Sequence, residues 1–168
     1  MQTTAIHTEV DAYRDAFAHE GEITKKLLRA FPADKADERP TESAQTTREI
    51  AWMLVLGVML VEPILAGRLL PEGDQPAPPA NWPDIVDGFD RVLEATKAKI
   101  ASLDDAAMNG MITTLVGPNA VGEARRGDML RMFLHDQIHH RGQLSVHLRM
   151  AGGRVPSIYG PSKDEPWF

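Results

Sequence analysis

The stretch FLHDQIHHRGQLSVHLRMAGGRVPSIYG, residues 133–160, decides how this sequence folds and where its chemistry lies. Its first part contains no proline and repeats apolar residues at helical spacing. It predicts a helix from about Gly127 to Met150 that ends at the glycine pair 152–153. His135 and His139 stand four residues apart within it. Side chains at positions i and i+4 of a helix lie one above the other, so the two imidazoles share one face.

Two neutral imidazoles on one helical face can direct their lone pairs at a single cation. Zinc, nickel, copper and ferrous iron all accept imidazole nitrogen. A catalytic site needs about three protein ligands and an open position for water or substrate. The pair therefore predicts half of a metal site, with a third ligand supplied from elsewhere in the chain. The structural alternative is a pair of core histidines satisfied by hydrogen bonds.

The string HDQIHHRGQL, followed by a tail of the form LRxxGGxVPxxYG, resembles the C-terminal helix of the DinB-like family, also called DinB/YfiT-like. The resemblance implies an all-α four-helix bundle with a three-histidine metal site. Two of these histidines belong to the last helix, where His135 and His139 match them, and one belongs to the second helix. The matching run in the second helix is residues 48–52, and Met53 follows where the histidine is expected.

Met53 weakens the expectation of a metal, because a thioether is a poor zinc ligand and suits Cu(I) better. We therefore expect a divalent transition metal, zinc, nickel or iron, to be weakly bound or absent. Glu49 lies one turn before Met53 on the same face and is a candidate third ligand. It also fits a capping box with Thr46, and the two roles compete. Met53, Ile138 and Gly142 are expected to line the pocket.

The last helix carries two apolar stripes. One contains the histidine pair and is otherwise apolar, which predicts that it faces inward; its members are Met132, His135, Ile138, His139, Gly142 and Val146. The nearly opposite stripe consists of Leu130, Phe133, Leu144 and Leu148. A helix with two stripes packs on both sides, against flanking helices or a second subunit. We expect a homodimer, since two-fold dimers are the commonest oligomers.

Composition predicts a single domain over residues 1–168, with 43% hydrophobic and 25% charged residues. A net charge of −6 argues against nucleic-acid binding, which requires an excess of Lys and Arg. There are no cysteines, so any thiol chemistry requires a cosubstrate. The N-terminus lacks the basic and apolar regions of a secretory signal, and we expect a cytoplasmic location.

Helical periodicity predicts three further helices, near residues 6–30, 46–70 and 84–102. Pro63 should kink or break the second of these. Residues 71–83, rich in proline and glycine, predict a long crossover connection. Residues 111–116 alone alternate as a short strand would, within an irregular segment. The apolar run 50–61 is too short to span a membrane, so no membrane partner is expected.

Four classes of function are compatible with this pattern. The first is a metal-dependent transferase that adds a low-molecular-weight thiol to an electrophile, the metal lowering the pKa of the thiol. The second is a metal-dependent hydrolase, which needs a general base that the sequence does not identify. The third is a metal-free protein that binds an apolar or anionic small molecule. The fourth is a structural or stress-response dimer without chemistry.

Overall fold

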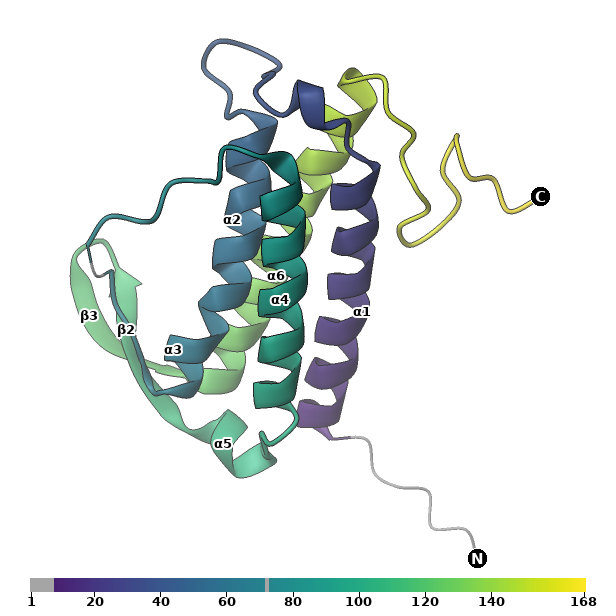
Figure 1. The fold of residues 1–168 in the computed structure, drawn as a ribbon. Helices are drawn as coiled ribbons and strands as arrows, with labels where there is room; N and C mark the ends of the chain where they lie inside the picture. Colours follow the sequence, from purple (N-terminus) through teal and green to yellow (C-terminus); the bar gives the residue numbers. More distant parts are fainter. Residues whose placement is uncertain (1–7, 72) are drawn as a thin grey trace, which may run out of the picture.

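A computed structural model describes residues 8–71 and 73–168. Within them four long helices lie side by side (Figure 1): α1 (Glu9–Ala30), α2 (Thr47–Met59), α4 (Trp82–Ile100) and α6 (Arg126–Met150). The short helical elements are η1 (Ala33–Lys35), α3 (Val61–Leu65) and α5 (Asp105–Asn109), and the strands are β1 (Arg68–Leu69), β2 (Met111–Gly117) and β3 (Ala120–Arg125). Thr8 caps α1, so the first two positions of the helix predicted from residue 6 lie outside the described residues.

Contacts at the helix ends define the helix directions. The Trp82 indole N–H at the start of α4 donates to the carbonyl of Leu28 near the end of α1. Thr47 at the start of α2 contacts His147 near the end of α6. Each of these pairs is therefore antiparallel. Helices α2 and α4 run in the same direction, and the segment between β1 and α4 returns the chain along them, as Figure 1 shows. This segment is the crossover predicted from residues 71–83.

The fold is mostly helical, but the all-α expectation is wrong in one region. Strands β2 and β3 form an antiparallel hairpin, and β1 adds to β2 in parallel, giving the order β1-β2-β3. Asn119 takes a φ of 57° in the hairpin turn, a conformation that asparagine tolerates. The predicted strand at residues 111–116 is confirmed. Strand β3 has no buried alternating face and β1 has only two residues, so neither pairing partner has a sequence pattern of its own.

The second helix ends earlier than predicted. The structure has two helices in place of one, with the interruption at Leu60 between α2 and α3. Pro63 explains this break, because its ring clashes with the carbonyl four residues earlier, that of Met59. The chain then forms β1 where the helix was predicted to continue to residue 70. The predicted break at proline is confirmed, and the predicted helical extent is wrong.

The core lies between the four long helices. Its most deeply buried side chains come from all four: Leu27, Leu28, Leu54, Ile85, Phe89, Leu93, Leu130, Leu144 and Leu148. Its α6 members are Leu130, Leu144 and Leu148, which belong to the stripe opposite the predicted histidine face. In the described part of the chain no helix combines the length and apolar character that crossing a membrane requires.

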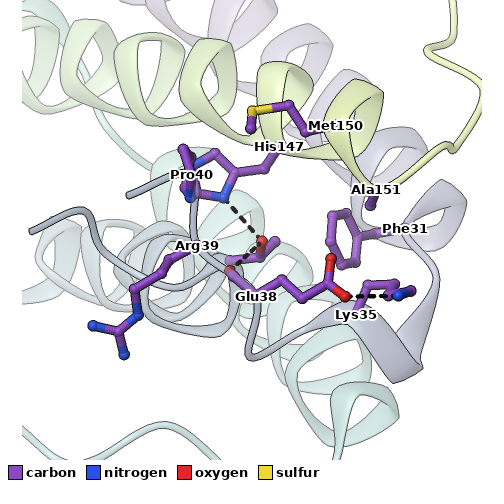
Figure 2. Close-up of a pocket in the computed structure, with 9 residues that line it drawn as sticks. Phe31, Lys35, Glu38, Arg39, Pro40, His147, Met150 and Ala151 are labelled. Carbon is purple, nitrogen blue, oxygen red and sulfur yellow. Dashed lines mark hydrogen bonds and ion pairs between the residues drawn. The ribbon is translucent and has the colours of Figure 1, made fainter. Parts of the chain in front are cut away.

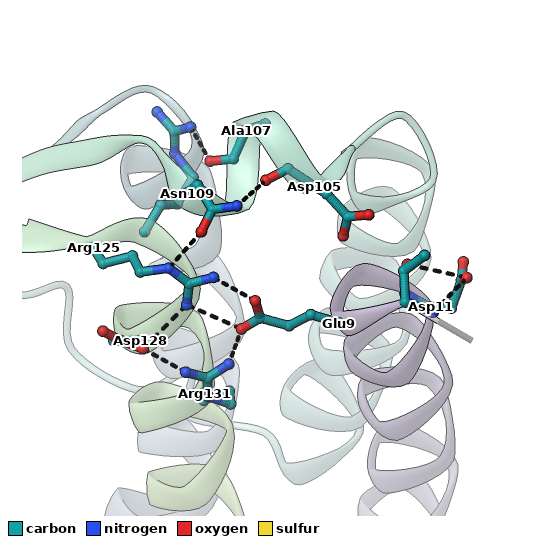
Figure 3. Close-up of polar contacts among 10 residues, drawn as sticks. Glu9, Asp11, Asp105, Ala107, Asn109, Arg125, Asp128 and Arg131 are labelled. Atoms are coloured by element: carbon teal, nitrogen blue, oxygen red, sulfur yellow. Dashed lines mark hydrogen bonds and ion pairs between the residues drawn. The ribbon is translucent and has the colours of Figure 1, made fainter. Parts of the chain in front are cut away.

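An acidic side chain ties the N-terminus of α1 to the junction of β3 and α6 (Figure 3). The Glu9 carboxylate accepts hydrogen bonds from the guanidinium groups of Arg125 and Arg131. Arg125 also donates to Asn109 of α5 at 2.9 Å, and both arginines contact Asp128. The cluster joins four segments of the chain and keeps α1 and α6 in register at this end.

Candidate functional site

The structure places the predicted histidine face on the outside of α6. His135 and His139 are exposed, as are Met132 and Val146, which are 48% and 57% exposed. Gly142 is exposed as well, and a Cβ built on it would meet nothing within 4 Å. The prediction that this face points inward is wrong. Of the expected pocket residues on α6, only Ile138 is even half-buried.

The two expected site residues of α2 have local partners. The Met53 sulfur accepts a hydrogen bond from the Gln45 side-chain amide at 3.1 Å. Glu49 closes the capping box, where its carboxylate accepts from the Thr46 backbone N–H at 2.7 Å. These hydrogen bonds from Thr46 hold the pKa of the Glu49 carboxyl below its ordinary value. Glu49 therefore carries out the capping role, while metal ligation by it stays a prediction.

A different acid–imidazole pair on α6 has its histidine one turn from Gln137, beside the boundary with α2. His140 is 9% exposed, and its Nε2 lies 3.5 Å from a carboxylate oxygen of Asp136, four residues earlier. Its Nδ1 lies 3.0 Å from the Gln143 side-chain oxygen. The sequence carries the signal for this pair in the same i, i+4 spacing that singles out His135 and His139. It was missed because two histidines are a more conspicuous pattern than one acid and one histidine.

Close approach of α2 and α6 creates this boundary. A Cβ on Gly57 would lie 1.9 Å from Nε2 of Gln137, so only glycine lets the Gln137 side chain occupy its place. Gln137 is buried, and its Nε2 has no hydrogen-bond partner among the described residues. Because α2 and α6 are antiparallel, Met53 on α2 lies near the level of His140 on α6.

A cavity lies where η1 and the segment after it cross the start of α2 and the end of α6 (Figure 2). Its volume is about 90 Å³, several times what one water molecule requires. Its lining is part apolar and part polar, and comprises Phe31, Lys35, Glu38, Arg39, Pro40, Thr47, His147, Met150 and Ala151. Sequence reasoning did not identify this site, because its residues come from three segments that only the tertiary fold brings together.

His147 and Thr47 are buried polar residues in the lining of this cavity. Nδ1 of His147 lies 2.9 Å from the Thr47 hydroxyl, which fixes the orientation of the ring. Its Nε2 has no hydrogen-bond partner within the described residues, so it is available to a ligand. Nε2 accepts a hydrogen bond when Nδ1 carries the proton, and it donates one when Thr47 donates to Nδ1. Burial lowers the pKa of His147, which keeps the imidazole neutral at pH 7.

Charged groups surround the cavity rim. The Lys35 ammonium pairs with the Glu38 carboxylate at 2.6 Å, and this hydrogen bond raises the pKa of Lys35. The Arg39 guanidinium donates to the carbonyl of Glu42 at 3.4 Å, and it forms no ion pair with a carboxylate in the described chain. The rim therefore presents one paired cation, Lys35, and the Arg39 guanidinium, whose charge is among the causes that lower the pKa of the Glu49 carboxyl.

The depressed pKa of His147 predicts a loss of stability in mild acid. The unfolded chain takes up a proton near the ordinary pKa of about 6.5, above the pKa of the folded state. The free energy of unfolding should therefore fall as pH decreases from 7 toward 5. We expect His147→Gln to flatten this dependence in urea titrations at each pH. Parallel plots of the free energy of unfolding against pH for the wild type and His147→Gln would contradict this prediction. The neighbouring charged residues Lys35, Glu38 and Arg39 are common to both proteins, so a difference between the plots reports on His147.

The residues present do not fit a metal site of three protein ligands. No three histidine, cysteine, aspartate or glutamate side chains in residues 8–71 and 73–168 gather closely enough to hold an ion. His135 and His139 face outward on α6, and the second-helix position is Met53. Asp136 and His140 are two donors without a third. The fold alone therefore does not supply the site that the resemblance implies.

The protein is a mostly helical protein with a small hairpin sheet, and its helices α2 and α6 pack antiparallel. These features define the class of protein to which it is compared. The model of the DinB family matches residues 1–167, and the chain belongs to this family. A relative, the protein YrdA of Bacillus subtilis (strain 168), is 30% identical over 159 residues, which are 93% of this chain and 91% of YrdA.

Solved structures share the fold. A DinB-like protein from Bacillus cereus ATCC 10987 superposes with a TM-score of 0.74 at 22% identity, over 89% of this chain and 97% of the other. YfiT from Bacillus subtilis superposes with a TM-score of 0.69 at 12% identity, over 90% and 92% of the two chains. YfiT is described as a probable metal-dependent hydrolase with an unusual four-helix bundle topology. At these identities the likeness concerns the fold.

Proposed function

We propose that this DinB-family protein binds a small anionic molecule in the cavity around His147 without a resident metal. The observation that carries the proposal is the buried imidazole of His147, which lines the cavity and is oriented by Thr47 through Nδ1. Nε2 has no hydrogen-bond partner among the described residues, and a ligand that bonds to it takes the place of water there. This makes His147 the anchor of the site.

The rim selects the charge of the ligand. Arg39 forms no ion pair with a carboxylate among the described residues, while Lys35 is neutralised by Glu38. A ligand with one carboxylate satisfies Arg39 and leaves the Lys35–Glu38 pair intact. The volume of about 90 Å³ admits the polar end of such a molecule, and Phe31 and Met150 provide apolar contact for a short chain. Hydroxy acids and mercapto acids of two to four carbons, roughly the size of this cavity, are suitable probes.

The test is thermal unfolding in the presence of EDTA with a panel of short hydroxy acids, mercapto acids and their neutral amides. At a concentration ten times the dissociation constant, a bound acid should add about 1.4 kcal/mol to the free energy of unfolding. We expect the acids to stabilise the protein and the amides to do so less. The stabilisation should disappear in His147→Gln and Arg39→Gln, and it should persist in His19→Gln, a control on the exposed surface of α1.

Stabilisation that survives His147→Gln would place the ligand elsewhere and defeat the proposal. A complete lack of stabilisation by the acids would do the same. Stabilisation that requires added metal would favour a metal-dependent function in its place.

The second candidate is a metal-dependent enzyme of the thiol-transferase or hydrolase type. The pairing of Asp136 with His140 at 3.5 Å favours it, because carboxylate and imidazole are both ligands of zinc and ferrous iron. The description of YfiT points in the same direction. This candidate requires one metal per chain that is lost in His140→Ala, together with consumption of a thiol or an ester. Retention of metal by that variant would exclude it.

A further inference from the structure

A groove lies between the parallel helices α2 and α4, which are side by side in Figure 1. Its volume is about 430 Å³, within the range of about 300–1,000 Å³ that small-molecule sites occupy. We call it the α2–α4 groove and define it by its lining: Trp52, Val55, Met59, Pro79, Asp84, Gly88, Arg91 and Val92. It shares no lining residue with the His147 cavity, so its role is independent of the proposed function.

The α2 wall of the groove is apolar, and the crossover segment holds it in place. The three α2 residues in the lining stand three and then four positions apart, so they form one line along the helix. The Trp52 indole N–H donates to the carbonyl of Pro76 at 2.6 Å, which satisfies its polar atom and fixes the ring. Arg48 donates to the carbonyl of Pro79 at 3.0 Å and holds the crossover at the groove. The groove therefore has a pre-formed aromatic wall.

Gly88 leaves the α4 side of the groove open. It is buried in the interior of α4, where glycine is less favourable than alanine by about 1 kcal/mol. Its φ is not positive, and a Cβ built on it would meet nothing closer than Nη2 of Arg91 at 3.9 Å. Neither the backbone nor packing against the protein therefore requires glycine at this position. The space over Gly88 belongs to the groove, where a side chain would take volume from a ligand.

One cation and one hydrogen-bond acceptor flank this space. The exposed Arg91 side chain folds back toward Gly88, and it makes no hydrogen bond or ion pair with any described residue. Exposed Asp87, four residues before Arg91, does not line the groove. Asp84 lies one turn before Gly88, about 6 Å along the helix axis. One Asp84 oxygen accepts from the Asn81 amide at 3.1 Å, and the other has no partner in the described part of the chain.

We infer that the α2–α4 groove binds an aromatic monocarboxylate with a hydroxyl group on the opposite side of its ring. The carboxylate pairs with Arg91, whose planar guanidinium matches a carboxylate in two parallel hydrogen bonds. The ring lies over Gly88 against Trp52, since aromatic pairs gain stability beyond the area that they bury. The hydroxyl donates to Asp84. Opposite substituents of a benzene ring are about 6 Å apart, close to one helical turn, so both polar contacts form together.

The experiment is isothermal titration calorimetry of the full chain with 4-hydroxyphenylacetate as the probe. We expect one molecule to bind per chain. The neutral 4-hydroxyphenylacetamide should bind at least about tenfold more weakly, because it loses the charged hydrogen bonds to Arg91. Arg91→Gln should weaken binding of the acid by a similar factor. Phenylacetate, which lacks the hydroxyl, should bind more weakly than the probe, and Asp84→Ala should remove this difference.

Gly88→Leu fills the groove and leaves both charged groups in place. Leucine is a better helix former than glycine, so the chain should stay folded while the probe no longer binds. Arg68→Gln is the matched control for charge, since this exposed arginine of β1 does not line the groove. It should bind the probe as the wild type does. His147→Gln should also leave the affinity unchanged, which separates this site from the proposed function.

The inference fails if the probe does not bind, if the amide binds as tightly as the acid, or if Gly88→Leu or Arg91→Gln retains the wild-type affinity. Loss of binding in His147→Gln would place the probe in the other cavity and would also overturn it. Self-association of the wild type that Gly88→Leu abolishes would mean that a second copy of the chain, and not a small molecule, occupies the groove.

Discussion

Arg141→Met is expected to lower the free energy of unfolding by about 3–5 kcal/mol, the cost of leaving a buried charge without its partner. Arg141 is 2% exposed, and its Nη1 lies 2.5 Å from the carboxylate of Glu20, which is itself largely buried. Its Nη2 donates to the Tyr159 hydroxyl at 2.5 Å, and that hydroxyl donates to Glu20 at 2.8 Å. The three side chains join α6, α1 and the tail after α6.

Urea unfolding at pH 7 measures the effect, and two variants calibrate it. Tyr159→Phe removes hydrogen bonds but no charge, so it should cost only about 0.5–1.5 kcal/mol per bond. Arg149→Ala removes a 46% exposed arginine that pairs with Asp164, and such surface pairs are worth about 0–1 kcal/mol. A loss in Arg141→Met no larger than in Arg149→Ala would mean that the buried pair does not hold the tail and helices together. Limited proteolysis of the tail should follow the same order.

Gly57→Leu is the substitution with the second large expected effect. It should lower the free energy of unfolding by about 1–3 kcal/mol through overpacking between α2 and α6. The first side-chain carbon would already lie 1.9 Å from Nε2 of Gln137 and 3.1 Å from its Cδ. Gln137 is buried and has little room to withdraw. The helices must then separate or the glutamine must leave the interior, and either change disturbs the neighbourhood of His140.

The double variant Gly57→Leu with Gln137→Ala tests this explanation. Removing the glutamine side chain should recover a large part of the free energy of unfolding that Gly57→Leu loses, because the clash is with that side chain. Gly142→Ala is the matched control, since its Cβ meets nothing within 4 Å and alanine is the better helix former by about 1 kcal/mol. Equal losses in the single and double variants would show that the backbone approach, and not Gln137, sets the packing here. Chemical denaturation of the four proteins distinguishes these outcomes.

Local signals predicted most of the elements well. The capping box of Thr46 and Glu49 marks the start of α2, and Pro63 marks its interruption, because both act through the backbone of neighbouring residues. The alternation of residues 111–116 predicts β2 for the same local reason. Strand β3 has a weaker pattern and forms because it pairs with β2. Pairing between strands depends on tertiary contacts, and the sequence of β3 alone does not indicate them.

The candidate sites were less predictable. The spacing of His135 and His139 correctly puts them on one face, but it does not say which way that face points. Asp136 and His140 have the same i, i+4 spacing, so spacing alone does not distinguish this pair from His135 and His139. The cavity around His147 has no sequence signature, since Thr47 and His147 are 100 residues apart. Only the antiparallel packing of α2 and α6 brings them together.

The sequence by itself determined the helices, the break at Pro63, the family resemblance and the shared face of the two histidines, since each depends on residues close together in the chain. Only the tertiary structure decided which stripe of α6 is buried. Both stripes are apolar, so hydrophobicity alone does not separate them. The buried side is the one on which Gln137 fits against Gly57 and Arg141 reaches Glu20. These specific long-range contacts stabilise one orientation of the helix and leave His135 and His139 outside.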